Sequence, residues 1–360
     1  MGNMIKLKGA LNPLPTLTWN FLKLNQVDVD WDIDLNRRGD MIIQNIPRGV
    51  SVKMNGGILD NVSGAAGSLT TELMEKEKVE TLGIRVEAGV CAEVPLKLNY
   101  VLGEGDGMLR RQEIVAYEGS EVTVAMDYTA GRTESGFFGI QTKLLAKKGS
   151  IIRLIKTNLL GDKYLHFEDI AGIAEDGARI ELIEMELGGG KNYIGTGIEL
   201  SGAKSSFVGN VGYLCRGQKI MDMNYLVRHT GRKSESSFKL RGAMRDSSIK
   251  NFRGTIDFRR GAKGAKGDEQ EESILLSRDV RNKTLPIILC DEEDVEGTHG
   301  ANIGRLSEDV LFYMGSRGIE KSEVEALMTK AKLDSVRRLI SDQVTQGRIQ
   351  QFMEEALDHA

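Results

Sequence analysis

Two residues near the end of the chain have the types and the spacing of a metal site. Cys290 ends the apolar segment TLPIILC, and His299 follows nine positions later, after the acidic stretch DEEDVEGT. A thiolate and a neutral imidazole are both ligands for iron or zinc. If the apolar segment is a strand, both residues face one edge of a sheet, where a second chain could complete the coordination. The alternative is a buried cysteine and a histidine that ends a strand.

The other candidate residues fit structural roles better. His166 lies in an alternating strand pattern and His229 at the end of another, so each is expected to be a hydrogen-bonded structural histidine. Three acids would suit the paired carboxylates of a polysaccharide-cleaving enzyme. They lie among lysines and arginines near predicted turns, so we expect them to be solvated. These acids are Asp222, Asp246 and Asp257.

Several kinds of catalytic motif are absent from the sequence. The glycine-rich segments LGEGDG and LGGGKN lack the spacing of a phosphate-binding loop or a dinucleotide fingerprint. No nucleophile elbow marks a serine hydrolase. The three cysteines lie far apart, and an all-cysteine iron–sulfur site usually takes four thiolates. A metal at this chain would therefore be shared with another chain.

The composition is typical of a β-rich chain that folds in water. Hydrophobic residues make up 40% and charged residues 28% of the 360 residues, and the net charge is -4. Lysine and arginine are interleaved with acids, which argues against a nucleic-acid-binding face. No apolar run approaches the ~20 residues of a membrane-spanning helix. Because the N-terminus also lacks a signal-peptide pattern, we expect a cytoplasmic protein.

Short strand patterns follow one another at regular intervals between residues 105 and 290. They alternate apolar with polar residues, as at Ile180 and Leu182, and break at Gly, Ser and Asp. The 42 glycines suggest many tight turns. An antiparallel sandwich and a coiled parallel sheet with a shared core both fit this pattern. We assign the strand-rich core to residues 41–302.

Three segments depart from the strand pattern. Residues 1–40 are expected to form a cap with a short helix that carries Trp19 and Phe21. A second helix is expected within TTELMEKEKVETL. The glycine-rich, charged stretch 259–273 is expected to be an exposed loop.

Residues 303–360 are expected to form a helical domain. Ser307 is placed to cap a helix that Gly318 ends. Ser322 and Glu325 have the spacing of a capping box for the next helix. Apolar residues with helical spacing in that helix are Val324, Leu327, Met328 and Ala331.

The segment EGTHGANIGRLSEDVLFYMGSRGIEKSEVEALMTKA resembles the C-terminal signature of the SufB/SufD family, the scaffold subunits of the SUF iron–sulfur cluster assembly system. The shared features are a histidine followed by a small residue and alanine, an acidic helix cap, the run LFY and the triplet SRG. A second block from His229 to Ser277 is similar to the family in the order of its residues. The likeness is clear over about residues 219–332 and looser from 100 to 218.

The resemblance implies a mainly β fold, a right-handed parallel β-helix flanked by N-terminal and C-terminal helical regions. It also implies two partners, a SufC-type ATPase docked on the C-terminal helices and a related SufB or SufD chain paired edge to edge. Because this chain lacks a phosphate loop, nucleotide hydrolysis would come from the ATPase. The residues expected to contact that ATPase are Leu306, Leu311, Phe312, Tyr313, Arg317 and Ile319.

Two departures from the SufB pattern favour a SufD-like member. The segment QEESILLS lacks a cysteine found in SufB-type chains, and Gly300 instead of glutamate follows His299. Gly297 stands where some SufD chains have a cysteine, so thiol chemistry is not expected there. His299 is therefore the chosen functional residue, a polar or metal-binding group between two scaffold chains, with Cys290 as a second candidate. An iron–sulfur cluster or iron would be shared with the partner chain.

Three functions remain open at this point. The first is a non-enzymatic, SufD-like scaffold that acts with a SufB-like chain and a SufC-type ATPase. The second is a self-paired scaffold that holds the nascent cluster with a second copy of itself. The third, from a different class, is a β-helix enzyme that cleaves polysaccharides.

Overall fold

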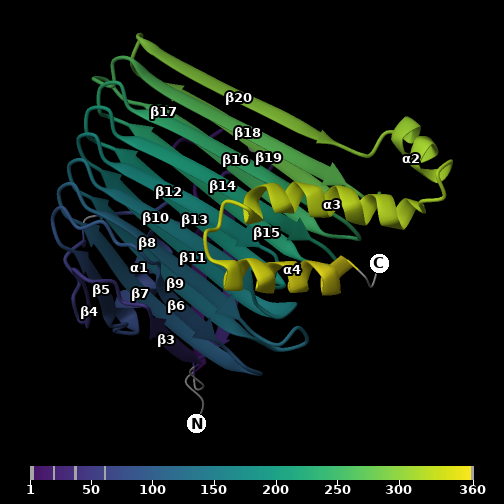
Figure 1. Cartoon of the computed structure of the whole chain (residues 1–360), viewed down its shortest axis with the longest axis horizontal. Coiled ribbons are helices and arrows are strands. Elements are labelled where there is room, and N and C mark those ends of the chain that lie inside the picture. Colours follow the sequence, from purple (N-terminus) through teal and green to yellow (C-terminus); the bar gives the residue numbers. More distant parts are fainter. Residues whose placement is uncertain (1–3, 19–20, 36–38, 61, 358–360) are drawn as a thin grey trace.

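The computed structural model describes residues 4–18, 21–35, 39–60 and 62–357, so Trp19 lies outside the described residues. Its body is a parallel β-helix (Figure 1). The strands that build it are β3 (Asp40–Gln44), β4 (Val50–Met54), β5 (Thr81–Val86), β6 (Leu96–Val101), β7 (Asp106–Ala116), β8 (Glu121–Thr129), β9 (Ser135–Ala146), β10 (Ile151–Leu159), β11 (Lys163–Ala174), β12 (Arg179–Glu186), β13 (Lys191–Leu200), β14 (Ser206–Cys215), β15 (Ile220–His229), β16 (Glu235–Met244), β17 (Ile249–Phe258), β18 (Ala265–Leu275), β19 (Arg281–Cys290) and β20 (Val295–Gly304).

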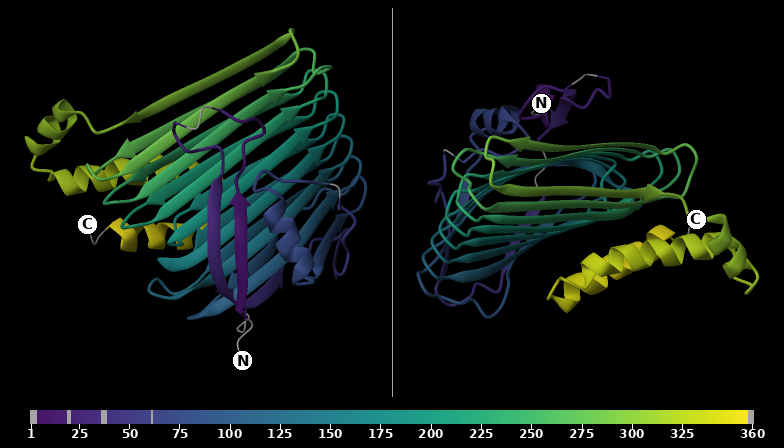
Figure 2. Two further views of the ribbon diagram at one scale, coloured as in Figure 1. Left: turned by 180° about the vertical axis from the view of Figure 1, so that it is seen from behind. Right: turned by 90° about the horizontal axis from the view of Figure 1, so that it is seen from above.

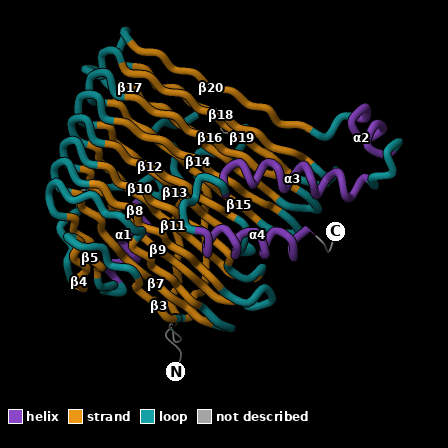
Figure 3. The backbone as a smooth tube through the Cα atoms, viewed as in Figure 1, coloured by secondary structure: helices purple, strands orange, loops and turns teal. Residues whose placement is uncertain are grey.

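These strands form two facing sheets. Sheet 1 has the order β20-β18-β16-β14-β12-β10-β8-β6-β3, and sheet 2 has the order β19-β17-β15-β13-β11-β9-β7-β5-β4. Consecutive strands from β5 onwards alternate between the sheets, as the tube in Figure 3 shows. Each pairs in parallel with the strand one coil later, so that Ile152 lies beside Ile180. The coiled parallel sheet is thereby confirmed over the antiparallel sandwich.

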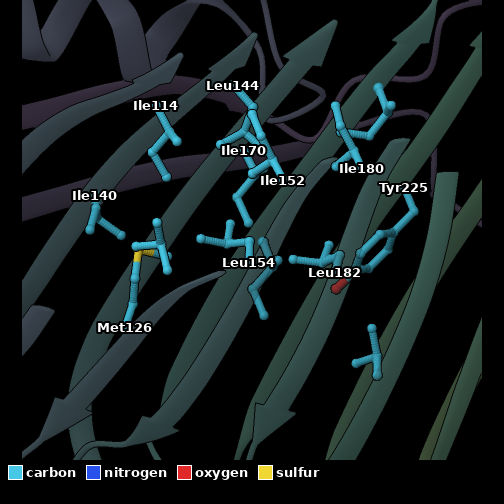
Figure 4. Packing of buried hydrophobic residues seen from close by; sticks show 14 of the residues in the cluster. Ile114, Met126, Ile140, Leu144, Ile152, Leu154, Ile170, Ile180, Leu182 and Tyr225 are labelled. Carbon is cyan, nitrogen blue, oxygen red and sulfur yellow. The ribbon is translucent and has the colours of Figure 1, made fainter. Parts of the chain in front are cut away.

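Strand alternation builds the core between the two sheets. Inward positions of successive coils carry apolar residues of similar size, such as Ile152 with Ile180 and Leu154 with Leu182. Figure 4 shows these side chains converging in the space between the sheets. Tight turns connect the strands, and Gly149 and Gly177 have φ values of 66° and 63°, a region that glycine adopts without strain. The lumen of the β-helix is therefore a packed interior.

The outer face of sheet 2 is covered by the N-terminal segment (Figure 2). Its antiparallel strands β1 (Met4–Leu11) and β2 (Val27–Asp34) pack with helix α1 (Ser68–Lys76). The helix expected around Phe21 is absent from the described residues, which form this hairpin and its loop instead. Alternation of Ile5 and Leu7 with charged residues suits a half-buried strand. The helix expected within TTELMEKEKVETL is confirmed by α1.

The outer face of sheet 1 is covered by the C-terminal helices. These are α2 (Glu308–Gly315), α3 (Lys321–Arg337) and α4 (Gln343–Leu357). Leu333 and Val336 of α3 and Ile349 of α4 pack in one cluster with outward-facing side chains of sheet 1, such as Ile183 and Leu214. Figure 1 shows α2 projecting beyond the sheet, and none of its residues is buried.

Three local predictions for this half of the chain have clear outcomes. Ser307 caps α2 through its side chain, which accepts a hydrogen bond from the backbone N–H of Val310. The capping box of α3 is formed by Glu320 and Glu323, so the predicted pair two residues later was wrong. The loop expected at 259–273 was also wrong, because β18 occupies most of it. Charged side chains on both faces of β18 hid its strand pattern.

Candidate functional site at the open end of the β-helix

The β-helix is open at its C-terminal end. β20 is the last strand of sheet 1 and β19 the last strand of sheet 2, so each has one edge that pairs with no other strand of the described chain. In Figure 1, β20 lies along this free edge. Free strand edges are templates for pairing with another chain. We call the segment Arg281–Gly304, which contains both edges and their turn, the rim.

Both predicted site residues lie in the rim and face the lumen. His299 is in register with Glu269, which is only 6% exposed, and Cys290 is in register with the buried Phe258. Neighbours in register on parallel strands project to the same face. Both rim residues are nevertheless exposed, because no further coil covers them. The alternative of a buried Cys290 is therefore wrong.

The fold does not bring Cys290 and His299 together. A Cβ on Gly297 would come within 3.3 Å of Ile288, so these two residues lie opposite each other across the lumen. Since β19 and β20 run in opposite directions, His299 lies opposite Pro286, four residues from Cys290. At ~3.3 Å per residue, His299 and Cys290 are therefore about 13 Å apart along the strand direction. One metal ion, with bonds of about 2 Å, cannot join both within one chain.

A buried carboxyl group lies in the coil beneath His299. The side chain of Glu269 occupies the space over Gly254, where an added Cβ would come within 2.1 Å of Oε2. Glu269 forms no hydrogen bond or ion pair with any residue that the structure describes. Burial, reinforced by the nearby Glu271 and Asp268, raises the pKa of Glu269 to about 8. Burial therefore favours the protonated form of this carboxyl group.

The next buried groups are matched in charge. Lys250 forms an ion pair with Glu271 and lies 3.3 Å from Ser273 Oγ. Ser273 in turn donates to Glu271 over 2.8 Å. Burial lowers the pKa of Lys250, and the Glu271 carboxylate opposes this effect. We call Lys250, Glu269, Glu271 and Ser273 the mouth cluster; Glu269 is its one member without a polar partner among the described residues.

Sequence reasoning missed the mouth cluster because three of its members lie in the stretch expected to be a loop. Ala265, Gly267, Glu269, Glu271 and Ser273 all face the lumen and are buried. The sequence gives little sign of this, because residues 268–272 are charged or amide residues on both faces of the strand, and apolar–polar alternation is absent there.

A second polar cluster lies deeper in the lumen. The Nζ atom of Lys156 lies 2.5 Å from Glu168, 3.0 Å from Glu184 and 2.7 Å from Glu186, and all four side chains are fully buried. Burial opposes the charge on Lys156, but the three carboxylates together raise its pKa well above the ordinary value. Burial also raises the pKa of Glu184 to about 7, against the attraction of Lys156. We call these four residues the central cluster.

The two interior histidines have structural roles, as predicted. His166 Nδ1 lies 2.8 Å from the carbonyl oxygen of Phe138. His229 is held between the hydroxyls of Ser234 and Ser236, at 2.8 and 2.9 Å. Burial lowers the pKa of His229 to about 4, so its ring is neutral at physiological pH.

The three acids considered for polysaccharide cleavage have separate environments. Asp246 is exposed, as expected. Asp222 and Asp257 are buried, so the expectation of solvation was wrong for them. Arg253 Nη1 lies 2.7 Å from Asp222, and Arg228 Nε lies 2.9 Å from Asp257. These arginines suggested a solvated surface in the sequence. In the fold they form ion pairs with the two carboxylates between neighbouring strands of sheet 2.

The rim alone does not provide a complete metal site. Among the described residues, no group of three or more His, Cys, Asp or Glu side chains is arranged to hold a metal ion. The two predicted donors, one imidazole and one distant thiol, suit an incomplete site. An iron–sulfur cluster handled here as cargo would need ligands from a second chain.

The C-terminal helices expose an apolar surface. Phe312 is 81% exposed, Tyr313 54% and Leu327 51%, and the guanidinium of Arg317 lies over the Tyr313 ring at 5.0 Å. Among the other predicted docking residues, Leu311 and Ile319 are half-buried and Leu306 packs against the helix–sheet cluster. The docking surface, as we call it, comprises Val310, Phe312, Tyr313, Arg317, Leu327 and Met328.

Comparison with known proteins identifies the family. Residues 100–332, more than half of the chain, match the family described as "SUF system FeS cluster assembly, SufBD core domain". The chain belongs to the SufBD family. This description is of cluster assembly and names no catalytic reaction, and it agrees with the family resemblance seen in the sequence.

Relatives with curated descriptions carry the same family name. The chain is 27% identical over 252 residues to the iron–sulfur cluster assembly protein SufD of Bacillus subtilis. The match covers 68% of this chain and 56% of that protein. It is 23% identical over 257 residues to a SufBD family protein of Mycobacterium leprae, covering 70% of this chain and 29% of that protein. A SufBD family protein of Staphylococcus saprophyticus is 22% identical over 249 residues, a match that covers 68% of this chain and 53% of that protein. The chain thus spans about half or less of these relatives.

Proposed function

We propose that this chain is a SufD-like scaffold subunit that assembles iron–sulfur clusters with a SufB-like chain and a SufC-type ATPase. The observation that carries the proposal is the rim: two free strand edges flank a lumen into which His299 projects. A second β-helix paired edge to edge would enclose His299 between the two chains. Gly300 after His299 and the likeness to a protein named SufD favour the SufD-like role.

The docking surface supports the ATPase as second partner. Phe312 and Tyr313 are apolar groups on a helix that projects away from the body, and exposed aromatic residues are enriched where proteins bind one another. α3 joins this surface to sheet 1 through Leu333 and Val336. Movement of the ATPase would reach the scaffold through this helix.

The proposal places assembly in the cytoplasm. Cys91, Cys215 and Cys290 are all free thiols, which the reducing cytoplasm preserves. No helix among the described residues is long and apolar enough to cross a membrane.

The direct test is cluster formation by a complex reconstituted from this chain, a SufB-like chain and the ATPase. His299→Ala should leave the complex assembled but reduce the yield of cluster, measured by visible absorption and by iron and sulfide content. Thr298→Ala is the matched control. Thr298 directly precedes His299, its side chain faces outward, and its hydroxyl donates a hydrogen bond to Asp268. Equal yields in all three complexes would remove His299 from the mechanism.

A second candidate is the self-paired scaffold, because the same free edges can pair with another copy of the chain. Native mass spectrometry of the purified chain distinguishes the two. A stable homodimer that forms clusters with the ATPase alone would favour self-pairing. A chain that pairs only with a SufB-like protein would exclude it.

The polysaccharide-cleaving enzyme is disfavoured. Asp222 and Asp257 are buried in ion pairs with arginines instead of facing each other across a cleft, and the family match describes cluster assembly.

A further inference from the structure

A cavity of about 370 Å³ lies between the N-terminal hairpin and three stacked turns of the β-helix. The turns join β10 to β11, β12 to β13 and β14 to β15, and they comprise residues 160–162, 187–190 and 216–219. Trp31 of β2 forms part of the cavity wall. None of the lining residues belongs to the rim or to the docking surface, so the proposed function does not use this cavity.

The middle turn is the glycine-rich segment LGGGKN, whose spacing does not match that of a phosphate-binding loop. A Cβ on Gly190 would come within 2.3 Å of the backbone oxygen of Asp162 in the turn beneath. Three successive residues without side chains therefore let the turns pack closely and leave a hollow between their neighbours. Arg216 of the next turn reaches across this hollow, and its Nη2 atom lies 2.8 Å from Asp162 Oδ2.

Positive charge is in excess around the cavity. The single carboxylate in its wall is Asp162, whereas four side chains are cationic: Lys163, Lys191, Arg216 and Lys219. Asp162 is already paired with Arg216. Lys163 and Lys191 are exposed and form no ion pair with any residue that the structure describes. A concave surface with charges of one sign raises the local concentration of ions of the opposite sign.

Two of these cations are held in the fold with part of their binding capacity unused. Lys219 is only 4% exposed, and its Nζ atom donates to three backbone carbonyl groups but forms no ion pair with a described carboxylate. Buried charges are normally paired. Burial lowers the pKa of Lys219 to about 8. The Nε atom of Arg216 is also buried and has no hydrogen-bond partner among the described residues. Both observations indicate a missing anion.

The charge and the size of the cavity select the class of anion. A phosphate group carries a charge of about −1.5 to −2 and has three strong acceptor oxygens, so it can bind several cations at once, whereas a carboxylate carries one charge. The cavity is near the lower end of the range for small-molecule sites, roughly 300–1,000 Å³. Trp31, Tyr164 and Leu165 provide an apolar part of the wall for the remainder of such a ligand.

We propose that this cavity binds the phosphate group of a small ligand, with Lys163, Lys191 and Arg216 as the donors. Lys219 contributes its charge from behind the wall, because its three N–H groups already bind backbone carbonyl oxygens. The phosphate group belongs either to inorganic phosphate or to a small phosphate ester. Three turns from successive coils build the site, which is why no single loop motif in the sequence marks it.

The test is a fluorescence titration of the full-length chain carrying Trp19→Phe, which leaves Trp31 as its one tryptophan. Inorganic phosphate and AMP are added separately, with sodium chloride keeping the ionic strength constant. Phosphate should change the Trp31 emission saturably, and Lys191→Gln or Arg216→Gln should weaken binding about tenfold. Lys204→Gln is the matched control and should leave the affinity unchanged. Lys204 is also an exposed turn lysine without an ion pair, but it lies beyond the far end of β13.

Circular dichroism of each variant checks folding. The Lys191 side chain forms no hydrogen bond or ion pair with described residues, so Lys191→Gln should fold even if Arg216→Gln does not. Tighter binding of AMP than of phosphate would identify a phosphate ester as the ligand, and equal or weaker binding of AMP would identify the inorganic ion. No saturable change with either probe, or equal affinity in the Lys191→Gln and parent chains, would overturn the inference.

Discussion

The central and mouth clusters show two ways of burying carboxyl groups in one lumen. In the central cluster, Glu168, Glu184 and Glu186 surround one lysine, and neighbouring coils seal it on both sides. In the mouth cluster, Lys250 matches Glu271 but nothing matches Glu269. Each of these three carboxyl groups lies within 3.0 Å of the Lys156 ammonium, so all of them share one cation. At the mouth, Glu269 contacts no cation among the described residues, so the difference between the two clusters is that every acid of the central one has an ion-pair partner.

The largest effect should come from removing the cation of the central cluster. Lys156→Met would leave three buried carboxylates without their counter-charge, and breaking a buried ion pair in this way costs about 3–5 kcal/mol of unfolding free energy. Urea denaturation measures the change. Lys191→Met, at an exposed position, is the control and should change stability by less than about 0.5 kcal/mol. Similar losses in both variants would show that Lys156 does not stabilise the three carboxyl groups around it.

The next effect tests the sealed part of the lumen through pH. The buried ring of His229 has a pKa of about 4, whereas the ordinary value is 6.5. Between these values the unfolded chain binds a proton that the folded chain does not, so stability should fall as the pH drops from 6.5 to 4, by about 3 kcal/mol. His229→Gln should remove this part of the acid slope in urea midpoints measured from pH 7.5 to 4.5. If the urea midpoint of the variant falls with pH as steeply as that of the wild-type chain, groups other than His229 cause the loss of stability in acid.

A smaller effect of opposite sign is expected at the mouth. Glu269→Met replaces an unpartnered buried carboxyl group with an apolar chain of similar length, which should stabilise the free chain by about 1 kcal/mol. A methionine substitution should therefore lower the free energy of unfolding in the central cluster and raise it in the mouth cluster. Thermal unfolding of the two methionine variants in parallel gives the comparison. A loss of stability in the Glu269 variant would show that its carboxyl group has a stabilising partner in the fold.

The smallest effect on stability should occur at the docking surface. Phe312→Ala removes a ring that is 81% exposed, so unfolding free energy should change by less than about 0.5 kcal/mol, while capture of the ATPase should decrease. Leu333→Ala on the buried face of the next helix should cost about 2–5 kcal/mol. If the Phe312 variant captures the ATPase as well as the wild-type chain does, the ATPase binds to a different face of the protein.

Much of the architecture follows from local patterns in the sequence. The strand alternation, the helix cap at Ser307 and the helical tail are set by neighbouring residues. The spacing of Val324, Leu327 and Met328 fits a helical stripe, yet the buried stripe instead consists of Thr329, Leu333 and Val336. Both stripes have the helical period, and only contact with sheet 1 decides which one is covered.

The candidate site was predictable in part. Alternation places Cys290 and His299 at the end of the strand series, but the distance between them depends on which residues lie opposite each other across the lumen. The turn geometry sets that register, and sequence spacing does not encode it. Glu269 was missed because polar residues occupy both faces of β18 around it, so that the segment resembles a solvated loop.

The loop of the N-terminal hairpin ties together distant parts of the chain. Asn12 donates a hydrogen bond to Asp222, 210 residues later, and the carbonyl oxygen of Leu24 accepts one from Arg253. At ribosomal rates of about 5–20 residues per second, Asn12 must wait roughly 10–40 s for its partner to be synthesised. Until then the apolar side of the hairpin has only part of its final cover. The hairpin is thus made well before Asp222 and Arg253 and is among the last segments to complete its native contacts.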